Sequence, residues 1–315
     1  MKKLLFILLT LLVVIVLTFL SYDIDFSNKF VVAGRVERLV ALILVSISIS
    51  YSTVVFQTIS DNKILTPSLM GYEYLYVFSQ VLLLLIFGGN SLFFRSKELS
   101  FIFASSIMIV YSLILYRVFF KRNKKNVYFI LLIGLVLGIF FNTSTQFLQM
   151  IINPNEFGYI QGAMFSSLSR ISIKTISIAV VTILIVIVYL SRFFKFLDIL
   201  VLGREYSLGL GVDYDKIARN QLIGISVLIA ISTSLIGPIT FIGVFISNIS
   251  YRLTNTYLHH RTITVAFFIT AMSMLAAQFV IEHILNYRHS LGVLINLAGG
   301  LYFILLILRT LRTKK

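Results

Sequence analysis

Long apolar stretches separated by short polar segments run along almost the whole chain. Most contain ~18 or more residues with few charges, which is the length that a helix needs to cross a bilayer. Because backbone in lipid must satisfy its own hydrogen bonds, only helices or a closed barrel can span. The stretches are too long and too uniformly apolar for barrel strands. We expect about ten transmembrane helices, at 4–20, 37–57, 68–88, 99–119, 127–150, 171–191, 218–236, 239–253, 262–283 and 291–308.

Two of these predicted spans have unusual sequences. The first, MKKLLFILLTLLVVIVLTFL, resembles a signal peptide, but it has no A-x-A-like cleavage site and its apolar run is long for one. We interpret it as an uncleaved first span. The eighth span is short and directly follows Gly237 and Pro238, which indicates a broken or tilted helix.

Composition agrees with a membrane location. The chain is 58% hydrophobic and only 12% charged, with a mean hydropathy of +0.98. A soluble domain carries about 25% charged residues, so an ordinary soluble protein is excluded. We expect one all-α, polytopic membrane domain that comprises residues 1–315.

The 27 Lys and Arg residues are divided unevenly between the two sides of this arrangement. An even number of spans puts both termini on one side. With Met1 inside, 19 basic residues lie inside, and the positive-inside rule then favours cytoplasmic termini. We interpret the net charge of +15 as inner loops facing anionic lipid rather than as a nucleic-acid site. The eight basic residues left outside are Lys29, Arg35, Arg38, Arg95, Lys97, Arg170, Lys174 and Arg288.

The sequence carries no recognisable catalytic or metal-binding motif. It has no cysteine, and none of its four histidines are spaced i, i+4. The pattern G-x-x-x-x-G-K-[ST] is absent, so any ATP hydrolysis must come from a partner that binds ATP and Mg²⁺. Acidic residues in the spans are almost absent: Glu282 lies near an outer end and Asp198 near an inner one. This disfavours an ion-coupled secondary transporter, which remains the alternative class.

A charged, glycine-containing segment lies on the predicted inner side, within 192–217. Its sequence LGREYSLGLG is long enough for one or two short helices, and Gly209 and Gly211 permit sharp chain reversals. Short helices between spans are suited to receive a partner protein, whereas composition alone also allows a plain solvated loop.

Five motifs in collinear order resemble a known permease family. LGREYSLGLGVD resembles L-G-x-E-x-A-x-x-L-G-V, and GPITFIG at 237–243 resembles G-P-I-x-F-[IV]-G. NKILTPSLMG at 62–71 is similar to N-P-L-A-x-P-x-x-L-G. The start of the second span at 34–50 and the last span at 290–303 also match, although Glu37, Ser290 and Leu301 replace prolines of the family. These motifs are those of the iron-siderophore and cobalamin (FecCD-type) permeases of binding-protein-dependent ABC importers.

This resemblance implies a transporter subunit rather than an enzyme, with the ten-helix type II ABC importer permease fold, in the cytoplasmic membrane of a bacterium. It implies a second permease, identical or homologous, two ATPase subunits, and an extracytoplasmic substrate-binding protein. The implied substrate is a ferric siderophore, with haem or cobalamin as alternatives. It also assigns ATPase coupling to Leu202, Gly203, Arg204, Glu205, Ser207, Gly209, Leu210 and Gly211.

Three arginines on the predicted outer side are candidates for docking the binding protein. Arg35 and Arg38 share a helix face if a helix begins there, and Arg288 lies in the last outer loop. Arginine can hold a carboxylate in a bidentate contact, and the resemblance implies that the binding protein presents acidic residues. The alternative is that these side chains snorkel to the membrane interface.

A polar cluster in the fifth apolar run, FNTSTQFLQ, is a candidate for the transport path. It has too many polar groups for a helix that faces lipid, and the resemblance implies that this span lines the path. Hydrogen bonding between helices is the alternative. The candidate path residues are Gln57, Asn142, Thr143, Ser144 and Gln146.

Overall fold

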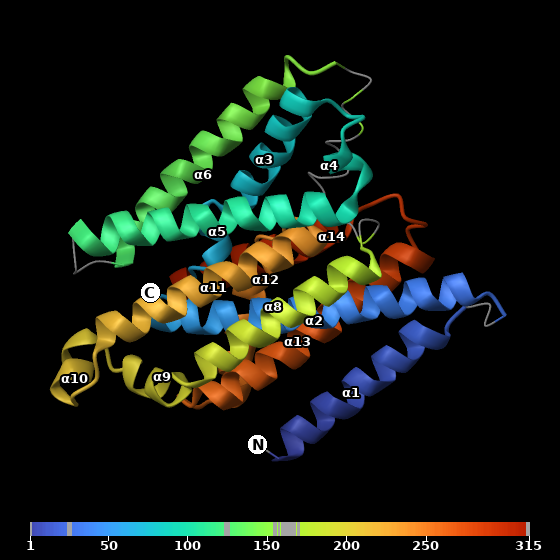
Figure 1. The fold of residues 1–315 in the computed structure, drawn as a ribbon. Coiled ribbons are helices and arrows are strands. Elements are labelled where there is room, and N and C mark those ends of the chain that lie inside the picture. Colours follow the sequence, from blue (N-terminus) through green and yellow to red (C-terminus); the bar gives the residue numbers. More distant parts are fainter. Residues whose placement is uncertain are drawn as a thin grey trace.

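The structure is a computed structural model that describes residues 2–23, 27–122, 127–153, 156, 158, 168 and 171–312. Figure 1 shows that the regular elements in these residues are all helical. In chain order they are α1 (Lys2–Ser21), α2 (Lys29–Ile59), η1 (Pro67–Met70), α3 (Tyr72–Phe87), α4 (Leu92–Arg95), α5 (Lys97–Arg122), α6 (Val127–Gln149), α8 (Ile173–Ser191), α9 (Phe194–Leu200), α10 (Arg204–Gly209), α11 (Tyr214–Ile236), α12 (Ile242–Thr254), α13 (His259–His283) and α14 (Leu291–Arg312).

Two helices, α2 and α11, form the centre of the bundle. In each helix, 78% of the residues in the most apolar 18-residue stretch are buried. The two helices pack on each other; α13 packs on α2, and α5 packs on α11. Their buried faces carry small hydroxyl residues, which let helices approach closely and bond across the contact. Ser50 bonds to Thr270 of α13 at 2.6 Å, and Tyr51 donates to Gln221 of α11 at 2.9 Å.

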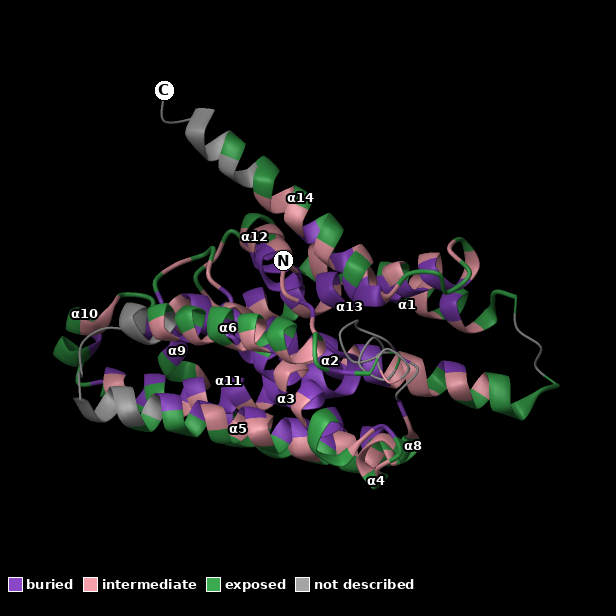
Figure 2. Cartoon of the chain, turned by 90° about the horizontal axis from the view of Figure 1, so that it is seen from above, coloured by how far each residue is buried: buried purple, intermediate pink, exposed green. Residues whose placement is uncertain are grey.

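The peripheral helices are far less covered. Only 17% of the residues in the corresponding 18-residue stretch are buried in α1 and in α6, and 28% are buried in α8. Figure 2 shows α14 extending away from the bundle, with exposed residues along its length. Apolar faces of this kind suit contact with lipid or with another membrane subunit.

The helices agree with the predicted spans. Each of the ten predicted spans overlaps helical structure, although α2 begins at Lys29 rather than at 37 and the third span is divided between η1 and α3. Seven of the described helices are long and apolar enough to cross a membrane. The helices α3, α12 and the apolar part of α14 are shorter, so the number of full crossings stays a prediction.

Two of the short helices begin after irregular backbone inside the bundle. Gly71, with φ +83°, separates η1 from α3, and Gly237, with φ +90°, ends α11 before the irregular segment 238–241 and α12. The eighth predicted span is therefore interrupted at its start, as Gly237 and Pro238 indicated. The third is interrupted too, which was not expected.

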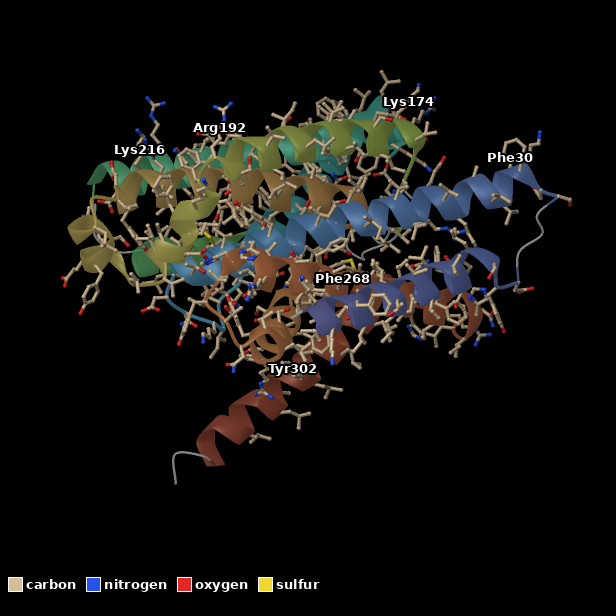
Figure 3. All side chains as sticks on the ribbon, turned by 90° about the horizontal axis from the view of Figure 1, so that it is seen from below. Phe30, Lys174, Arg192, Lys216, Phe268 and Tyr302 are labelled. Carbon is tan, nitrogen blue, oxygen red and sulfur yellow. The ribbon has the colours of Figure 1, made fainter. Side chains whose placement is uncertain are left out.

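The two ends of the bundle carry different elements. Figure 3 places Lys216 and Arg192 toward the end that holds α9 and α10, and Lys174 and Phe30 toward the opposite end. This separation agrees with the predicted inner and outer groups of basic residues; Arg170 lies outside the described residues. We refer below to the α10 end and the opposite end of the bundle.

Candidate coupling surface and transport path

Two glycines shape the segment around α10. Gly203, with φ +89°, precedes the helix, and Gly211, with φ +80°, follows it. Both angles fall where a β-carbon would be strained. The expectation that Gly209 also reverses the chain was wrong, because α10 continues through Gly209 and the turn comes at Gly211.

Side-chain contacts hold α10 firmly against the start of α11. The guanidinium of Arg204 donates two hydrogen bonds to the carboxylate of Asp215, from Nε to Oδ1 at 3.1 Å and from Nη2 to Oδ2 at 2.8 Å. The hydrogen bond and charge of Asp215 raise the pKa of Arg204 above its ordinary value. Ser207 is fully buried and donates to the carbonyls of Gly203 and Ile199. A displacement of α10 would therefore be passed directly to α11.

The outer surface of the α10 segment is apolar and exposed. Leu202 is 53% exposed, Tyr206 73% and Leu210 62%, and Leu208 lies among them. Glu205 is also exposed. Large apolar side chains exposed in this way fit a contact with a partner protein or with the membrane. We call Leu202, Tyr206, Leu208 and Leu210 the coupling patch.

A pair formed by the half-buried Asp198 and the buried His259 attaches α9 to the rest of the bundle. The carboxylate of Asp198 lies 2.8 Å from the backbone nitrogen of His259 and 2.7 Å from its ring Nδ1. The other ring nitrogen lies 2.8 Å from the hydroxyl of Thr58 on α2. Asp198 thus caps the start of α13 and links the α9–α10 segment to two long helices.

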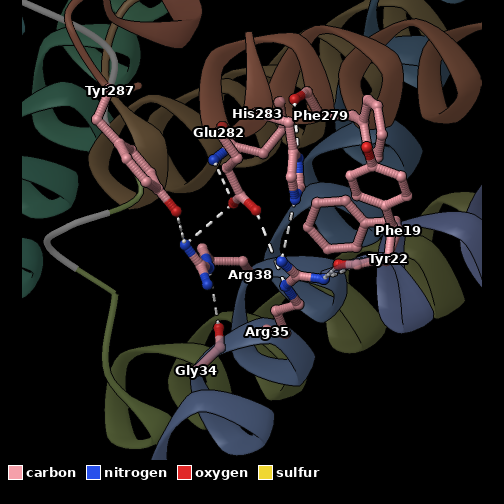
Figure 4. A network of polar contacts seen from close by, with 10 residues as sticks. Phe19, Tyr22, Gly34, Arg35, Arg38, Phe279, Glu282, His283 and Tyr287 are labelled. Carbon is pink, nitrogen blue, oxygen red and sulfur yellow. Dashed lines mark hydrogen bonds and ion pairs between the residues drawn. The ribbon is translucent and has the colours of Figure 1, made fainter. Parts of the chain in front are cut away.

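Arg35 and Arg38, predicted to dock a binding protein, belong to an internal network at the opposite end (Figure 4). Arg35 is 6% exposed and donates to the carbonyls of Phe19 and Tyr22, the former in the last turns of α1 and the latter just beyond them. Arg38 forms an ion pair of 3.0 Å with the buried carboxylate of Glu282 on α13, which lies 3.9 Å from Arg35.

Aromatic and polar groups complete this network at the opposite end of the bundle. Arg38 also donates to the hydroxyl of Tyr287. Arg35 donates to Nε2 of His283, whose ring stacks on Phe279. The network thus ties α1, α2 and α13 together, and Arg35 presents little surface to a partner. Arg288, the third candidate, is exposed. The docking role of all three remains a prediction.

The polar cluster of α6 is mostly directed away from the chain's own core. Thr143 and Gln146 are exposed, Asn142 and Ser144 are half-buried, and Thr145 is buried. Thr143 donates to the carbonyl of Ile139 within its own helix, which lowers the cost of placing a hydroxyl at membrane depth. This exposed polar face is available to a path or to a second subunit.

Gln57 lies instead at the wall of a cavity near the α10 end. The cavity measures about 540 Å³ and its lining includes Lys63, Tyr251 and Val201. The side-chain nitrogen of Gln57 donates to the carbonyl of Lys63 at 2.8 Å and to the hydroxyl of Ser247 at 2.9 Å. The structure therefore separates Gln57 from the α6 cluster, and its role in the path remains a prediction.

Sequence reasoning missed Glu73, an acid within the predicted span 68–88. Glu73 is 5% exposed and accepts from the hydroxyls of Thr240 and Ser68 and from the backbone nitrogen of Ile239. Among the described residues it has no ion-pair partner. A carboxylate inside a predicted span was the signal that could have drawn attention to it.

Glu73 lies inside the helix bundle, away from its α10 end. It shares a small cavity with Ile49, which precedes the end of α2 by a helical rise of ~15 Å. The two interrupted segments, at η1–α3 and at 237–241, therefore meet through Glu73 and Thr240. The side-chain oxygen of Asn296 on α14 accepts hydrogen bonds from the backbone N–H groups of Thr240 and Phe241. These N–H groups lie outside any helix, and Asn296 supplies the partner that they need in a membrane.

Known proteins are similar to this chain in sequence and in fold. The profile of the FecCD transport family matches residues 3–309. The petrobactin import system permease protein YclO of Bacillus subtilis (strain 168) is 39% identical, with 92% of each chain covered. The petrobactin import system permease protein FatC of Bacillus anthracis is 34% identical, over 89% of this chain and 79% of that protein.

A solved structure supports the fold. An inward-facing conformation of a metal-chelate type ABC transporter matches with a TM-score of 0.80 and 21% identity, and covers 97% of this chain and 98% of that one. The all-helical ABC transporter permease fold implied by the five motifs is therefore confirmed, while the number of crossings and the side of the termini stay predictions. Its bacterial relatives and its seven membrane-length helices make this a multi-pass protein of the bacterial cytoplasmic membrane. The chain belongs to the FecCD transport family.

Proposed function

We propose that this chain is the permease of an ABC importer that carries a ferric siderophore across the cytoplasmic membrane. The observation that carries the proposal is the coupling patch, an exposed apolar surface fixed to α11 by Arg204 and Asp215. Such a surface fits a cytoplasmic partner that drives movement. The relatives named as petrobactin import permeases make petrobactin the first cargo to test.

The remaining subunits follow from this role. Residues 1–315 act as one transmembrane domain, and 192–217 is its cytoplasmic coupling segment. A second permease covers the exposed faces of α6 and α14, and the path runs between the two permeases. Two ATPase subunits, which bind ATP and Mg²⁺, dock on the coupling patch. An extracytoplasmic binding protein delivers the cargo at the opposite end, where Arg288 is exposed.

Reconstitution tests this function directly. The chain is assembled in liposomes with its ATPase, its second permease and its binding protein, and the uptake of iron-55 ferric petrobactin is measured with and without ATP. Ferric hydroxamate, ferric enterobactin, haem and cobalamin are the comparison cargoes. ATP-dependent uptake of one ferric siderophore is expected. Uptake of haem or cobalamin alone would show that this compound, and not a ferric siderophore, is the cargo. Accumulation without the ATPase would indicate an ion-coupled transporter.

The orientation has its own test. Because the chain contains no cysteine, a single introduced cysteine can be labelled without background. A cysteine at Arg95 should react with a membrane-impermeant maleimide in intact cells, whereas cysteines at 123 and 313, which lie outside the described residues, should be protected. Labelling of 123 from outside would reverse the orientation and move the coupling patch away from the cytoplasm.

A further inference from the structure

The start of α3 brings four separate parts of the bundle into contact. We call Gly71, Tyr72 and Glu73 the α3 junction. The hydroxyl of Tyr72 lies 2.7 Å from Ser112 of α5 and 2.7 Å from Ser226 of α11. Glu73 bonds to Thr240 in the segment that follows α11. The junction thus contacts α11 both along its length and just beyond its end.

The same junction supports α6 through backbone rather than side chains. A β-carbon on Gly71 would lie 2.9 Å from the carbonyl oxygen of Gly134 and 2.9 Å from the α-carbon of Gly138, both on α6. A β-carbon on Gly138 would lie 3.0 Å from the α-carbon of Gly71. Contacts this close leave no side chain between the two backbones to absorb a movement. A shift of Gly71 is therefore a shift of α6.

The helix α11 connects this junction with the coupling patch. At its first turn Asp215 is gripped by Arg204 of α10, and beyond its last turn Thr240 is held by Glu73. Between these points it is a buried helix of 23 residues. Coupling between distant sites is carried by rigid helices and by hydrogen-bond and ion-pair contacts of this kind.

We propose that Tyr72 and Glu73 are positioning residues that pass a displacement of α11, produced at the coupling patch, to the polar face of α6. The inference rests on the proposed function, since it needs an ATPase that moves α10. It assigns transport-related roles to two buried residues of the bundle interior. Losing the junction should leave ATP hydrolysis intact and disconnect it from uptake.

The chain offers a matched control for this test. Tyr51, like Tyr72, is a buried tyrosine whose hydroxyl bonds to a side chain of α11, but it lies on α2. Tyr72→Phe and Tyr51→Phe therefore each remove a hydroxyl group and its hydrogen bond to α11. Only the first variant alters the α3 junction. Glu73→Gln is the second test variant, since it keeps the shape of the side chain and replaces the carboxyl group by an amide.

Each variant is measured in the assembled importer in liposomes, with phosphate release and uptake of iron-55 ferric petrobactin recorded together. Tyr51→Phe should keep the wild-type ratio of uptake to ATP hydrolysed. Tyr72→Phe and Glu73→Gln should lower this ratio ~5-fold or more, the factor that corresponds to the loss of about 1 kcal/mol of coupling. Stimulated hydrolysis should stay within about twofold of wild type.

A spin label at position 146 gives a direct reading of α6, because the chain has no native cysteine. The label should change its environment on ATP binding in Tyr51→Phe and not in Tyr72→Phe. The inference would be overturned if Tyr72→Phe and Tyr51→Phe had equal ratios of uptake to ATP hydrolysed. It would also be overturned if ATP hydrolysis and uptake fell in parallel in Tyr72→Phe. Absence of ATP-dependent uptake in the wild type would instead reject the proposed function, and the inference with it.

Discussion

Replacing Arg35 by methionine should destabilise this protein rather than impair docking alone. The substitution keeps an unbranched apolar side chain and removes a guanidinium that is 6% exposed. The carbonyls of Phe19 and Tyr22 at the end of α1 would lose their donor. The nearby carboxylate of Glu282 would keep only Arg38 as an ion-pair partner.

The size of this effect follows from the burial of the network. Removing one partner of a buried charge network costs ~3–5 kcal/mol, and hydrogen bonds to charged groups are worth ~1.5–3 kcal/mol each. These contributions overlap, so we expect a loss of ~3 kcal/mol. At ~2 °C per kcal/mol for a large chain, the melting temperature should fall by ~6 °C.

Melting of the detergent-solubilised chain, followed by the loss of its size-exclusion peak, measures this loss. Arg288→Met is the matched control, because Arg288 is exposed and its loss should shift melting by no more than ~1 °C. Equal melting of the two variants would refute the stabilising network. If Arg35→Met also bound the binding protein more weakly than the control did, Arg35 would belong to the docking surface after all.

Three further outcomes are expected. Gly71→Ala should lower the melting temperature, since its β-carbon would meet α6 at 2.9 Å and its φ is +83°, whereas Gly34→Ala, with nothing within 4 Å, should be tolerated. Gly211→Val should cost ~1–2 kcal/mol of strain and reduce stimulated ATP hydrolysis, while a substitution at the helical Gly209 should preserve it. Tyr206→Ser should leave melting of the isolated chain unchanged, because Tyr206 is 73% exposed, and weaken ATPase binding ~30-fold in a titration.

The sequence predicted the helices well because membrane insertion makes strong demands on composition. Each predicted span overlaps helical structure, since apolar runs of this length have few other stable states in lipid. The break before α12 was also predicted, because Gly237 and Pro238 interrupt the run visibly. The break before α3 was not, because Pro67 and Gly71 lie at the start of a run that remains apolar on average.

Burial of individual polar residues was harder to predict. Arg35 appeared available for docking because its partners, the carbonyls of α1 and Glu282, are remote in sequence or belong to the backbone. Glu73 was overlooked for a related reason: two of its three donors come from the segment at 239–240, which only the fold brings near. The α10 segment was found because its motif and its glycines are contiguous. Sites formed by contiguous residues could thus be predicted from the sequence, whereas networks between distant segments could be found only in the structure.

The wide separation of Arg35 and α13 in the chain has a consequence for synthesis. Arg35 and His283 are 248 residues apart, and a ribosome adds ~5–20 residues per second. About 12–50 s therefore pass between the emergence of these two positions. During that time α1 lacks the helix against which it chiefly packs, and Arg35 can keep its charge hydrated only by reaching toward the membrane surface. The helix α1 thus finds its main packing partner only after α13 has been made, and in a chain truncated before α13 neither Arg35 nor Arg38 has its acidic partner Glu282.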